Sequence, residues 1–273
     1  MTDPASPFTP AVGMVDRLDS RGFGPSADDL AFAEAYLAPG DLDPEWMARL
    51  TDPERRAARE AMSAERKARD WPALGQYREA NEALAGQPVD VVFIGDSITE
   101  FWRVADPALF SGRIVNRGIS GQTSPQILLR FMADVVALKP KAVHILCGGN
   151  DMAGNTGPST VEDYRNTILA MLTLAEAHGI KVILGALTPF NVVSWNPAVG
   201  DLRERTAELN AWQAALVVER GLVRADYFSA LADADGRLRP EFHRDGVHPT
   251  RAGYDVMRPV AERAIQEALA WFA

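Results

Sequence analysis

The chain has 273 residues, of which 47% are hydrophobic and 24% charged, and this composition excludes wholesale disorder and fibrous repeats. The net charge of −9 at pH 7 repels phosphate backbones and anionic membrane surfaces, so we expect no general nucleic-acid binder. Cys147 is the single cysteine and cannot form a disulfide within the chain, and no stretch reaches the roughly 18 apolar residues needed to span a bilayer. No secretory signal is visible, so we expect a cytoplasmic protein unless a signal was removed.

The N-terminal third, residues 1–88, is expected to be an extension of the main domain. Residues 1–26 are rich in Pro, Gly, Ser and Asp and predict an irregular arm. Helices are predicted over 27–37, Pro44–Leu50 and the highly charged segment Glu54–Arg69. A last helix is expected to pack onto the main body through the apolar residues Trp71, Leu74, Tyr77 and Leu84. No motif in this region indicates chemistry.

From residue 89 to 273 the sequence alternates between strands and helices. The predicted strands are apolar throughout, and the helix over 160–178 has its apolar residues on one side. Apolar strands separated by helices predict a parallel five-stranded sheet covered on both faces, a three-layer α/β/α sandwich. The predicted strands are Val89–Ile94, Arg113–Asn116, Ala142–Cys147, Lys181–Leu187 and Leu222–Asp226, and the predicted helices lie near 124–138, 160–178, 202–220 and 250–272.

The first strand ends in Gly95-Asp96-Ser97, directly before a predicted helical turn. In such a sheet, ligands bind beyond the carboxyl ends of the strands. A helix N-terminus stabilises negative charge, so Ser97 is placed well for a nucleophile. An ordinary N-cap serine would have the same sequence context. Thr99 replaces the second glycine of G-x-S-x-G, so the α/β-hydrolase elbow is not supported.

The second and third strands also end in residues that suit a binding site. Gly118 follows the second strand, where its backbone N–H is a candidate oxyanion donor. The third strand ends in Gly148-Gly149-Asn150-Asp151, where the Asn150 amide is a further candidate donor. Ordinary turns are the alternative interpretation of both segments.

A candidate base lies in Asp245-Gly246-Val247-His248, before the last helix. A serine nucleophile needs a base, and the base needs a carboxylate that fixes its tautomer. The spacing allows Asp245 to reach one ring nitrogen of His248 across a turn. A metal site formed by His243, Asp245 and His248 is the rival interpretation, disfavoured because no fourth ligand lies nearby.

These segments together resemble the SGNH family of GDSL-type esterases and lipases. The resemblance covers about residues 88–273 and is closest to bacterial members related to platelet-activating-factor acetylhydrolase, through DVVFIGDSITEFW, NRGISGQTSPQ and GGNDMAGNTGP. It implies a flavodoxin-like SGNH hydrolase fold and a triad of Ser97 as nucleophile, His248 as base and Asp245 as its orienting acid. It also implies an oxyanion hole formed by the N–H groups of Ser97 and Gly118 and the Asn150 amide, without metal or organic cofactor.

Other residues near these motifs are expected to have structural or substrate-binding roles. Asp96 is expected to brace its turn, and Cys147, His144 and His178 are expected to be structural. The loop Thr188–Gly200 should lie on the active-site face, where Phe190 and Trp195 are predicted to form an acyl or sugar subsite. Trp102 is predicted to flank the same opening.

The resemblance implies a serine esterase for small-molecule esters with short acyl groups, acetyl favoured, with acetylated carbohydrate as one natural substrate. Alternatives are a lysophospholipid or acyl thioester substrate, or an acyltransferase using the same serine ester. A non-catalytic binding module is the alternative from another class, although Ser97, Asp245 and His248 are all present. The sequence leaves self-association open.

Overall fold

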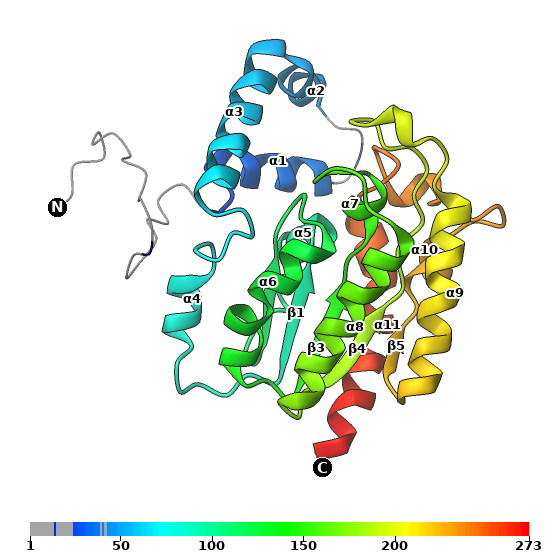
Figure 1. Ribbon diagram of the computed structural model, residues 1–273. Helices are drawn as coiled ribbons and strands as arrows, with labels where there is room; N and C mark the ends of the chain where they lie inside the picture. The colour runs from blue at the N-terminus through cyan, green and yellow to red at the C-terminus, as the bar shows by residue number, and fades with distance from the viewer. Residues whose placement is uncertain (1–13, 15–23, 39, 41–42, 273) are drawn as a thin grey trace.

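The computed structural model describes residues 14, 24–38, 40 and 43–272. Five parallel strands form one sheet in the order β2-β1-β3-β4-β5 (Figure 1). Gly95 at the end of β1 is in register with Gly118 of β2 and Leu146 of β3, so the loops after these three strands meet at one edge. The strands are β1 (Val91–Gly95), β2 (Ile114–Gly118), β3 (Ala142–Leu146), β4 (Lys181–Gly185) and β5 (Val223–Ala225).

Helices cover both faces of the sheet because alternate strand residues point to opposite sides. In β1, Val92 and Ile94 pack with α6 (Ser124–Asp134), α8 (Val161–Ala177) and α9 (Arg203–Arg220). Val91 and Phe93 pack on the other side with α5 (Ser97–Ala105), α10 (Tyr227–Leu231) and α11 (Arg251–Leu269). The predicted three-layer α/β/α sandwich with its five-stranded parallel sheet is confirmed.

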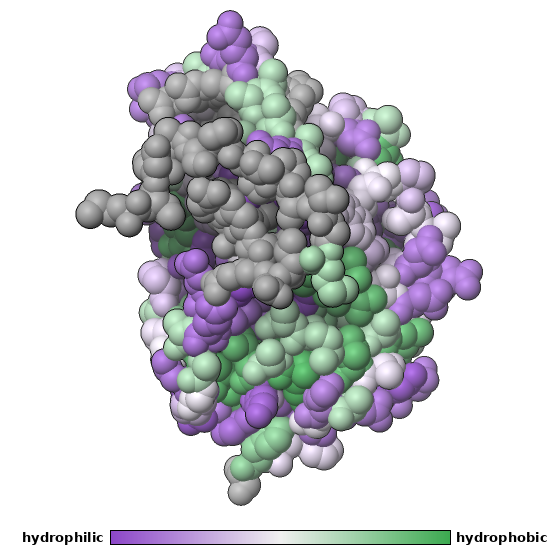
Figure 2. Space-filling view, turned by 60° about the vertical axis from the view of Figure 1, so that its left-hand side comes forward, coloured by the Kyte–Doolittle hydropathy of each residue, from purple (hydrophilic) through white to green (hydrophobic). Residues whose placement is uncertain are grey.

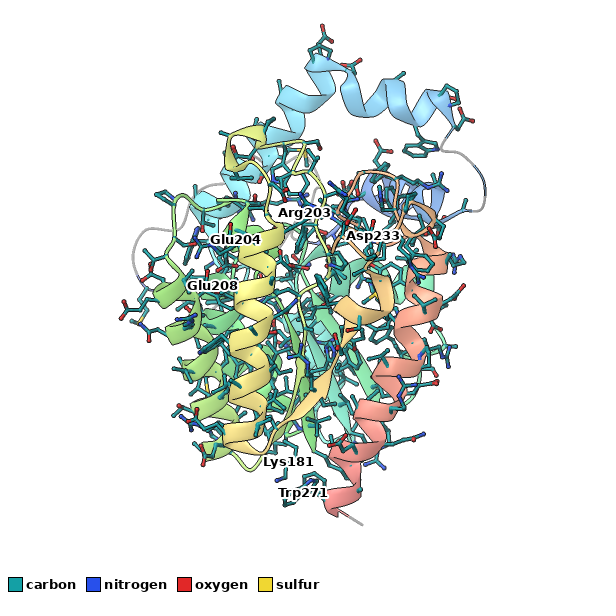
Figure 3. All side chains as sticks on the ribbon, turned by 90° about the vertical axis from the view of Figure 1, so that its right-hand side faces the viewer. Lys181, Arg203, Glu204, Glu208, Asp233 and Trp271 are labelled. Atoms are coloured by element: carbon teal, nitrogen blue, oxygen red, sulfur yellow. The ribbon has the colours of Figure 1, made fainter. Side chains whose placement is uncertain are left out.

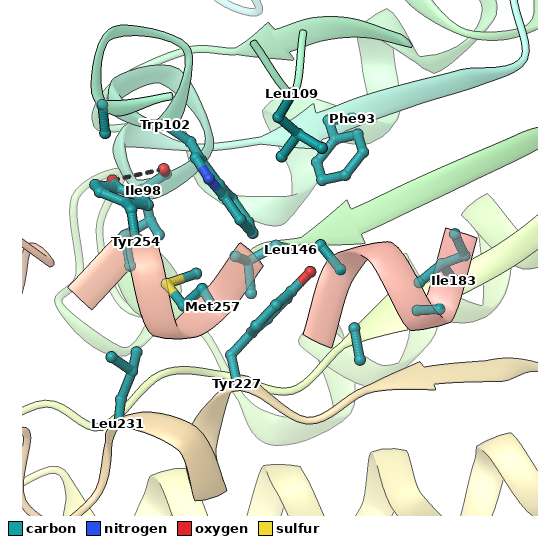
Figure 4. Packing of buried hydrophobic residues seen from close by; sticks show 14 of the residues in the cluster. Phe93, Ile98, Trp102, Leu109, Leu146, Ile183, Tyr227, Leu231, Tyr254 and Met257 are labelled. Carbon is teal, nitrogen blue, oxygen red and sulfur yellow. Dashed lines mark hydrogen bonds between the residues drawn. The ribbon is translucent and has the colours of Figure 1, made fainter. Parts of the chain in front are cut away.

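Trp102 lies in the core of this second layer, and its predicted place at the substrate opening is wrong. Its side chain is 0% exposed and is surrounded by the rings of Phe93, Tyr227 and Tyr254, at centroid distances of 5.5 to 5.8 Å. Figure 4 shows these rings packed together, with the Tyr254 hydroxyl donating to the Ile98 carbonyl oxygen. Trp102 faces inward because α5 turns this side toward the sheet, so its role is packing.

The N-terminal extension forms α1 (Ala27–Leu37), α2 (Pro44–Thr51), α3 (Pro53–Arg69) and α4 (Arg78–Ala83). Figure 1 shows α1 at the same end of the molecule as α7 (Gly149–Met152), the short helix that follows β3. Most of the predicted arm over 1–26 lies outside the described residues. The division of the chain at residue 88 stays a prediction.

Tyr77 attaches the segment before α4 to the end of β2. Its side chain is buried, its hydroxyl donates to the Gly118 carbonyl oxygen, and the Arg117 guanidinium lies 4.9 Å from its ring centroid. The extension is thus joined to a strand end near the candidate site.

Short 3₁₀ turns complete the chain: Val136–Leu138, Pro197–Val199, Pro240–Phe242 and Ala270–Phe272. The last of these packs under the sheet, where the Lys181 ammonium lies 3.3 Å from the Trp271 ring centroid (Figure 3). This cation–π contact holds the end of the described chain against the start of β4.

The surface seen in Figure 2 mixes hydrophilic and hydrophobic residues, with more hydrophobic colour in its lower half. Exposed large hydrophobic side chains among the described residues include Leu129 and Met132 of α6. Single exposed apolar residues are normal in monomers, so self-association stays a prediction. Among the described helices, none has the length and apolar character required to span a membrane.

Candidate active site

Ser97, His248 and Asp245 come together at the carboxyl edge of the sheet. Ser97 Oγ lies 2.9 Å from His248 Nε2, and His248 Nδ1 lies 2.6 Å from Asp245 Oδ2. These distances allow a proton to pass from the serine to the imidazole while the carboxylate binds the opposite ring nitrogen. The three side chains therefore form one continuous line of contacts from a hydroxyl through an imidazole to a carboxylate.

The turn between β1 and α5 places Ser97. Asp96 is the N-cap of α5, and its Oδ1 accepts a hydrogen bond of 3.0 Å from the Ile98 N–H. Ser97 is the first residue of α5, where backbone N–H groups lack partners within the helix and the helix dipole favours negative charge. Burial raises the pKa of Asp96 to about 7. Asp96 therefore braces the turn, as expected, in a buried position beside the serine.

The loop before α11 fixes Asp245 with its two oxygens in different roles. Oδ1 accepts from the backbone N–H groups of Val247 at 3.0 Å and His248 at 2.8 Å, which leaves Oδ2 for the imidazole. Gly246 has φ +83°, a value that side chains other than glycine rarely adopt. The positive φ of Gly246 allows the tight turn that brings the Asp245 carboxylate back onto His248.

The same pair of residues shifts each other's pKa in opposite directions. Burial alone would raise the pKa of Asp245, but the charge of His248 and the hydrogen bonds from His248 and Val247 lower it below its usual range. Burial alone would lower the pKa of His248, but the Asp245 charge and hydrogen bond, with the charge of Asp96, raise it. The site therefore stabilises an imidazolium, as a general base requires when it has taken up a proton.

His243 does not join His248 and Asp245 in a metal site. Its Nδ1 accepts from the Gly246 N–H at 2.9 Å, and its Nε2 lies 3.1 Å from Asn191 Nδ2. Among the residues that the structure describes, no group of three His, Cys, Asp or Glu side chains is arranged to hold a metal ion. The rival interpretation of the sequence is not supported by this geometry.

Asn150 lies beside Ser97 and is held by three neighbours. Its Oδ1 accepts from Asn155 Nδ2 at 2.7 Å, and its Nδ2 donates to the Gln122 carbonyl oxygen at 3.0 Å and to Asp96 Oδ2 at 3.3 Å. Asn155 Oδ1 in turn accepts from Trp195 Nε1 at 2.9 Å. The side chains of Trp195, Asn155 and Asn150 thus form a chain of hydrogen bonds that orients the Asn150 amide.

The predicted oxyanion role of Gly118 is wrong, because its N–H is already used. It donates to Asn116 Oδ1 at 2.9 Å. A Cβ at Gly118 would lie 2.2 Å from the Glu100 backbone nitrogen, so this glycine allows α5 to pack closely on β2. Its place at a strand end reflects packing.

Gly121, three residues further on, is a better candidate for a backbone N–H donor than Gly118. Gly121 was not selected from the sequence. It has φ +78°, its carbonyl oxygen accepts from Asn155 Nδ2 at 3.3 Å, and no hydrogen bond from its N–H is found within the described part of the chain. The sequence did contain a signal, since a second glycine follows Gly118, the last residue of β2, in Gly118-Ile119-Ser120-Gly121.

A cavity of only about 10 Å³ lies at Ser97, and its wall includes Asn150, Phe190, Trp195 and His248. Phe190 is buried, whereas Trp195 is 47% exposed with its ring centroid 6.3 Å from that of His248. Phe190 and Trp195 thus line the same cavity as Ser97, and their role as a substrate subsite stays a prediction. A groove of about 640 Å³ begins on the other side of Trp195 and reaches α3 and Trp71.

Tyr36 of α1 touches the candidate acid and was missed by sequence reasoning. Its hydroxyl lies 3.1 Å from Asp245 Oδ1. No sequence pattern could reveal a contact between residues 209 positions apart.

Cys147 and His144 are buried, and His144 Nε2 lies 2.7 Å from the Tyr227 hydroxyl. Burial lowers the pKa of His144 to about 3 and raises that of the Cys147 thiol, consistent with the structural roles expected of both.

Comparison with known proteins gives matches over most of the main domain. The model of the GDSL-like lipase/acylhydrolase family matches residues 93–256. A solved GDSL-like lipase from Bacteroides thetaiotaomicron is 38% identical with a TM-score of 0.70, over 72% of this chain and 99% of that chain.

Two curated proteins are also similar to this chain. Esterase TesA of Pseudomonas aeruginosa is 29% identical over 151 residues, 55% of this chain and 67% of TesA. The uncharacterized lipoprotein YqeF of Bacillus subtilis is 39% identical over 79 residues, which are 28% of this chain and 32% of YqeF. This chain therefore matches about a third of the length of YqeF.

Proposed function

Since this chain belongs to the GDSL-like lipase/acylhydrolase family and is by family a carboxylic ester hydrolase, we propose that Ser97, His248 and Asp245 hydrolyse short-chain esters through an acyl-enzyme. The observation that carries the proposal is the continuous pair of contacts from Ser97 Oγ through the His248 ring to Asp245 Oδ2, 2.9 and 2.6 Å long.

The reaction proceeds in two steps, acylation of Ser97 and hydrolysis of the acyl-enzyme. Ser97 Oγ attacks the ester carbonyl carbon while its proton passes to His248 Nε2, and the tetrahedral intermediate collapses when Nε2 returns that proton to the leaving alcohol. Water then attacks the serine ester in the same way, with His248 as its base, and releases the carboxylic acid and Ser97. Asp245 keeps its negative charge throughout and stabilises the imidazolium formed in each step.

The oxyanion is held by the Ser97 N–H at the start of α5, the Asn150 amide and the Gly121 N–H in place of that of Gly118. The 3.3 Å contact from Asn150 Nδ2 to Asp96 is the longest of its bonds, so a small rotation directs this N–H to a bound oxyanion. Gly121 is linked to the same amide through Asn155, which donates to both Gly121 and Asn150.

The acyl group is acetyl. The cavity beside Ser97 has about 10 Å³, comparable with the space that one water molecule needs, and a methyl group is of similar size. Phe190 and Val193 close it from the loop after β4, so a longer chain would collide with these side chains.

The alcohol part of the substrate lies in the groove beyond Trp195, and we assign it to a carbohydrate. The groove is lined by two exposed tryptophans, Trp71 and Trp195, and by polar side chains that include Asp29, Arg66, Lys67 and Gln76. Indole faces can cover the apolar side of a sugar ring while charged and polar side chains bond its hydroxyls. About 640 Å³ is enough for more than one ring.

The test is hydrolysis of p-nitrophenyl esters from acetate to long chains, beside an acetylated xylose oligosaccharide. We expect kcat/KM to be highest for acetate, and Ser97→Ala to abolish turnover. Ser111→Ala is the matched control, because the Ser111 hydroxyl bonds the Ala108 carbonyl oxygen on an exposed loop, and it should retain full activity. Unchanged turnover in Ser97→Ala would refute the nucleophile, and a maximum at long chains would refute the acetyl preference.

The expected cytoplasmic location stays a prediction.

A further inference from the structure

Tyr36 brings the N-terminal extension into direct contact with the proposed triad. Its side chain is 3% exposed, and its hydroxyl lies 3.1 Å from Asp245 Oδ1 and 2.8 Å from the His248 carbonyl oxygen. The same hydroxyl oxygen accepts from the Arg244 N–H at 3.1 Å. One buried hydroxyl therefore joins both ends of the loop that carries the acid and the base.

The sequence of α1 explains how the tyrosine reaches this place. Ser26 and Asp29 form a capping box that starts the helix, and Ala33, Tyr36 and Leu37 make its buried side, at the spacing of one helical face. The Tyr36 ring packs against Phe32, Phe101 and His248, with centroids 6.0 to 6.5 Å apart. The helix is thus seated on α5 and on the edge of the imidazole.

Arg244 fastens the end of α1 to the same loop. Its Nε donates to the Tyr36 carbonyl oxygen at 2.8 Å and its terminal nitrogen to the Ala38 carbonyl oxygen. The last carbonyl groups of a helix lack partners within the helix, so the guanidinium satisfies groups that would otherwise need water. The residue next to Asp245 therefore fixes the position of the Tyr36 hydroxyl.

We propose that Tyr36 is a positioning residue of the active site, whose hydroxyl holds the Asp245 carboxylate and the His248 backbone so that α1 completes the catalytic arrangement. The inference rests on the proposed function of the triad. Packing alone would be satisfied by phenylalanine, and a buried hydroxyl costs free energy unless it is hydrogen-bonded. The single proton of the Tyr36 hydroxyl is shared between Asp245 Oδ1 and the His248 carbonyl oxygen. It adds to the two backbone N–H groups that Oδ1 already accepts from, and this set of contacts restrains rotation of the carboxylate away from the ring.

The test is Tyr36→Phe in the full chain, assayed on p-nitrophenyl acetate across pH. The charged groups that act on His248 are Asp245 in its own loop and Asp96 before α5. Loss of one donor to Asp245 leaves more of its charge to act on the imidazolium. We expect kcat to fall by about tenfold, KM to stay the same, and the acid limb of the kcat/KM profile to move to higher pH.

Tyr227→Phe is the matched control, because it also removes one buried hydroxyl, but one that contacts His144 in the core. It should lower the melting temperature and leave the pH profile unmoved. An unchanged kcat and acid limb in folded Tyr36→Phe would overturn the inference, whereas activity that survives Ser97→Ala would overturn the proposed function instead. If Tyr36→Phe does not fold, Arg244→Gln is the second variant. It retains the Tyr36 hydroxyl but removes the bonds that hold the end of α1. It should lower kcat and move the acid limb to higher pH by smaller amounts than expected for Tyr36→Phe, and an unchanged kcat and acid limb would overturn the inference.

Discussion

Phe190 lies directly against Gly149: a Cβ added to the glycine would be 2.5 Å from Cζ of the Phe190 ring. The absence of a side chain at residue 149 therefore lets the ring reach the wall of the small cavity beside Ser97. This contact joins the loop after β4 to the loop after β3. It makes Phe190 the residue that sets the length of the acyl group in the proposed reaction.

Phe190→Leu should enlarge the acyl cavity and admit longer chains. We expect the ratio of kcat/KM for p-nitrophenyl butyrate to that for the acetate to rise by about tenfold, the usual effect of one or two methylenes in a hydrophobic pocket. Phe131→Leu is the control, since Phe131 is buried in α6 among residues of the opposite sheet face. An equal change of the ratio in both variants would show that a general loss of core packing, and not the size of the acyl cavity, alters the chain-length preference.

The pH dependence of kcat/KM follows from the raised pKa of His248. Only the neutral imidazole accepts the serine proton, so activity should be lost as the pH falls through this pKa, and the acid limb should lie above the ordinary value of 6.5. Asp245→Asn removes the charge that raises the pKa and leaves the lowering by burial. We expect about a 10⁴-fold loss of kcat, with the residual acid limb at lower pH. Initial rates between pH 4 and 9 test both, and an acid limb well below 6.5 in the wild-type protein would contradict the assignment.

Asn150→Ala should slow turnover more than Asn155→Ala. The loss of one oxyanion donor typically costs about 10²–10³ in kcat. Asn155→Ala retains the Asn150 Nδ2 donor and removes the hydrogen bond that Asn155 donates to Asn150 Oδ1. Steady-state kinetics on p-nitrophenyl acetate separate the two roles. Equal losses in both variants would show that Asn150 acts only through the structure of its loop.

Trp102→Ala should lower stability without changing substrate binding. Loss of a fully buried tryptophan typically costs about 3–5 kcal/mol of unfolding free energy, and the neighbouring rings of Phe93, Tyr227 and Tyr254 cannot fill its space. Urea denaturation measures the stability, and KM for p-nitrophenyl acetate should remain that of the wild type. If this variant does not fold, Trp102→Phe gives a smaller loss with the same expectation. A raised KM with unchanged stability would restore the substrate role first predicted for Trp102.

The sequence was sufficient for the elements of the main domain, because strands buried on both faces and helices with one apolar side leave strong local patterns. The sequence also pointed to Ser97, Asn150, Asp245 and His248. The position of the strand ends suggested where a site lies, but the resemblance to the SGNH family was needed to select these four residues, because each one alone also fits an ordinary cap or turn. The structure places all four of these residues at that edge.

Only the tertiary structure decided what depends on distant contacts. Trp102 follows Ser97 closely in sequence, yet the helical turn directs its side chain into the core. Gly118 and Gly121 look alike in the sequence, and the Asn116 side chain decides which N–H is occupied. Tyr36 lies in a segment without any motif and reaches Asp245 because α1 docks on α5. Local periodicity records which side of an element is buried, but it carries no information about which distant residue lies against it.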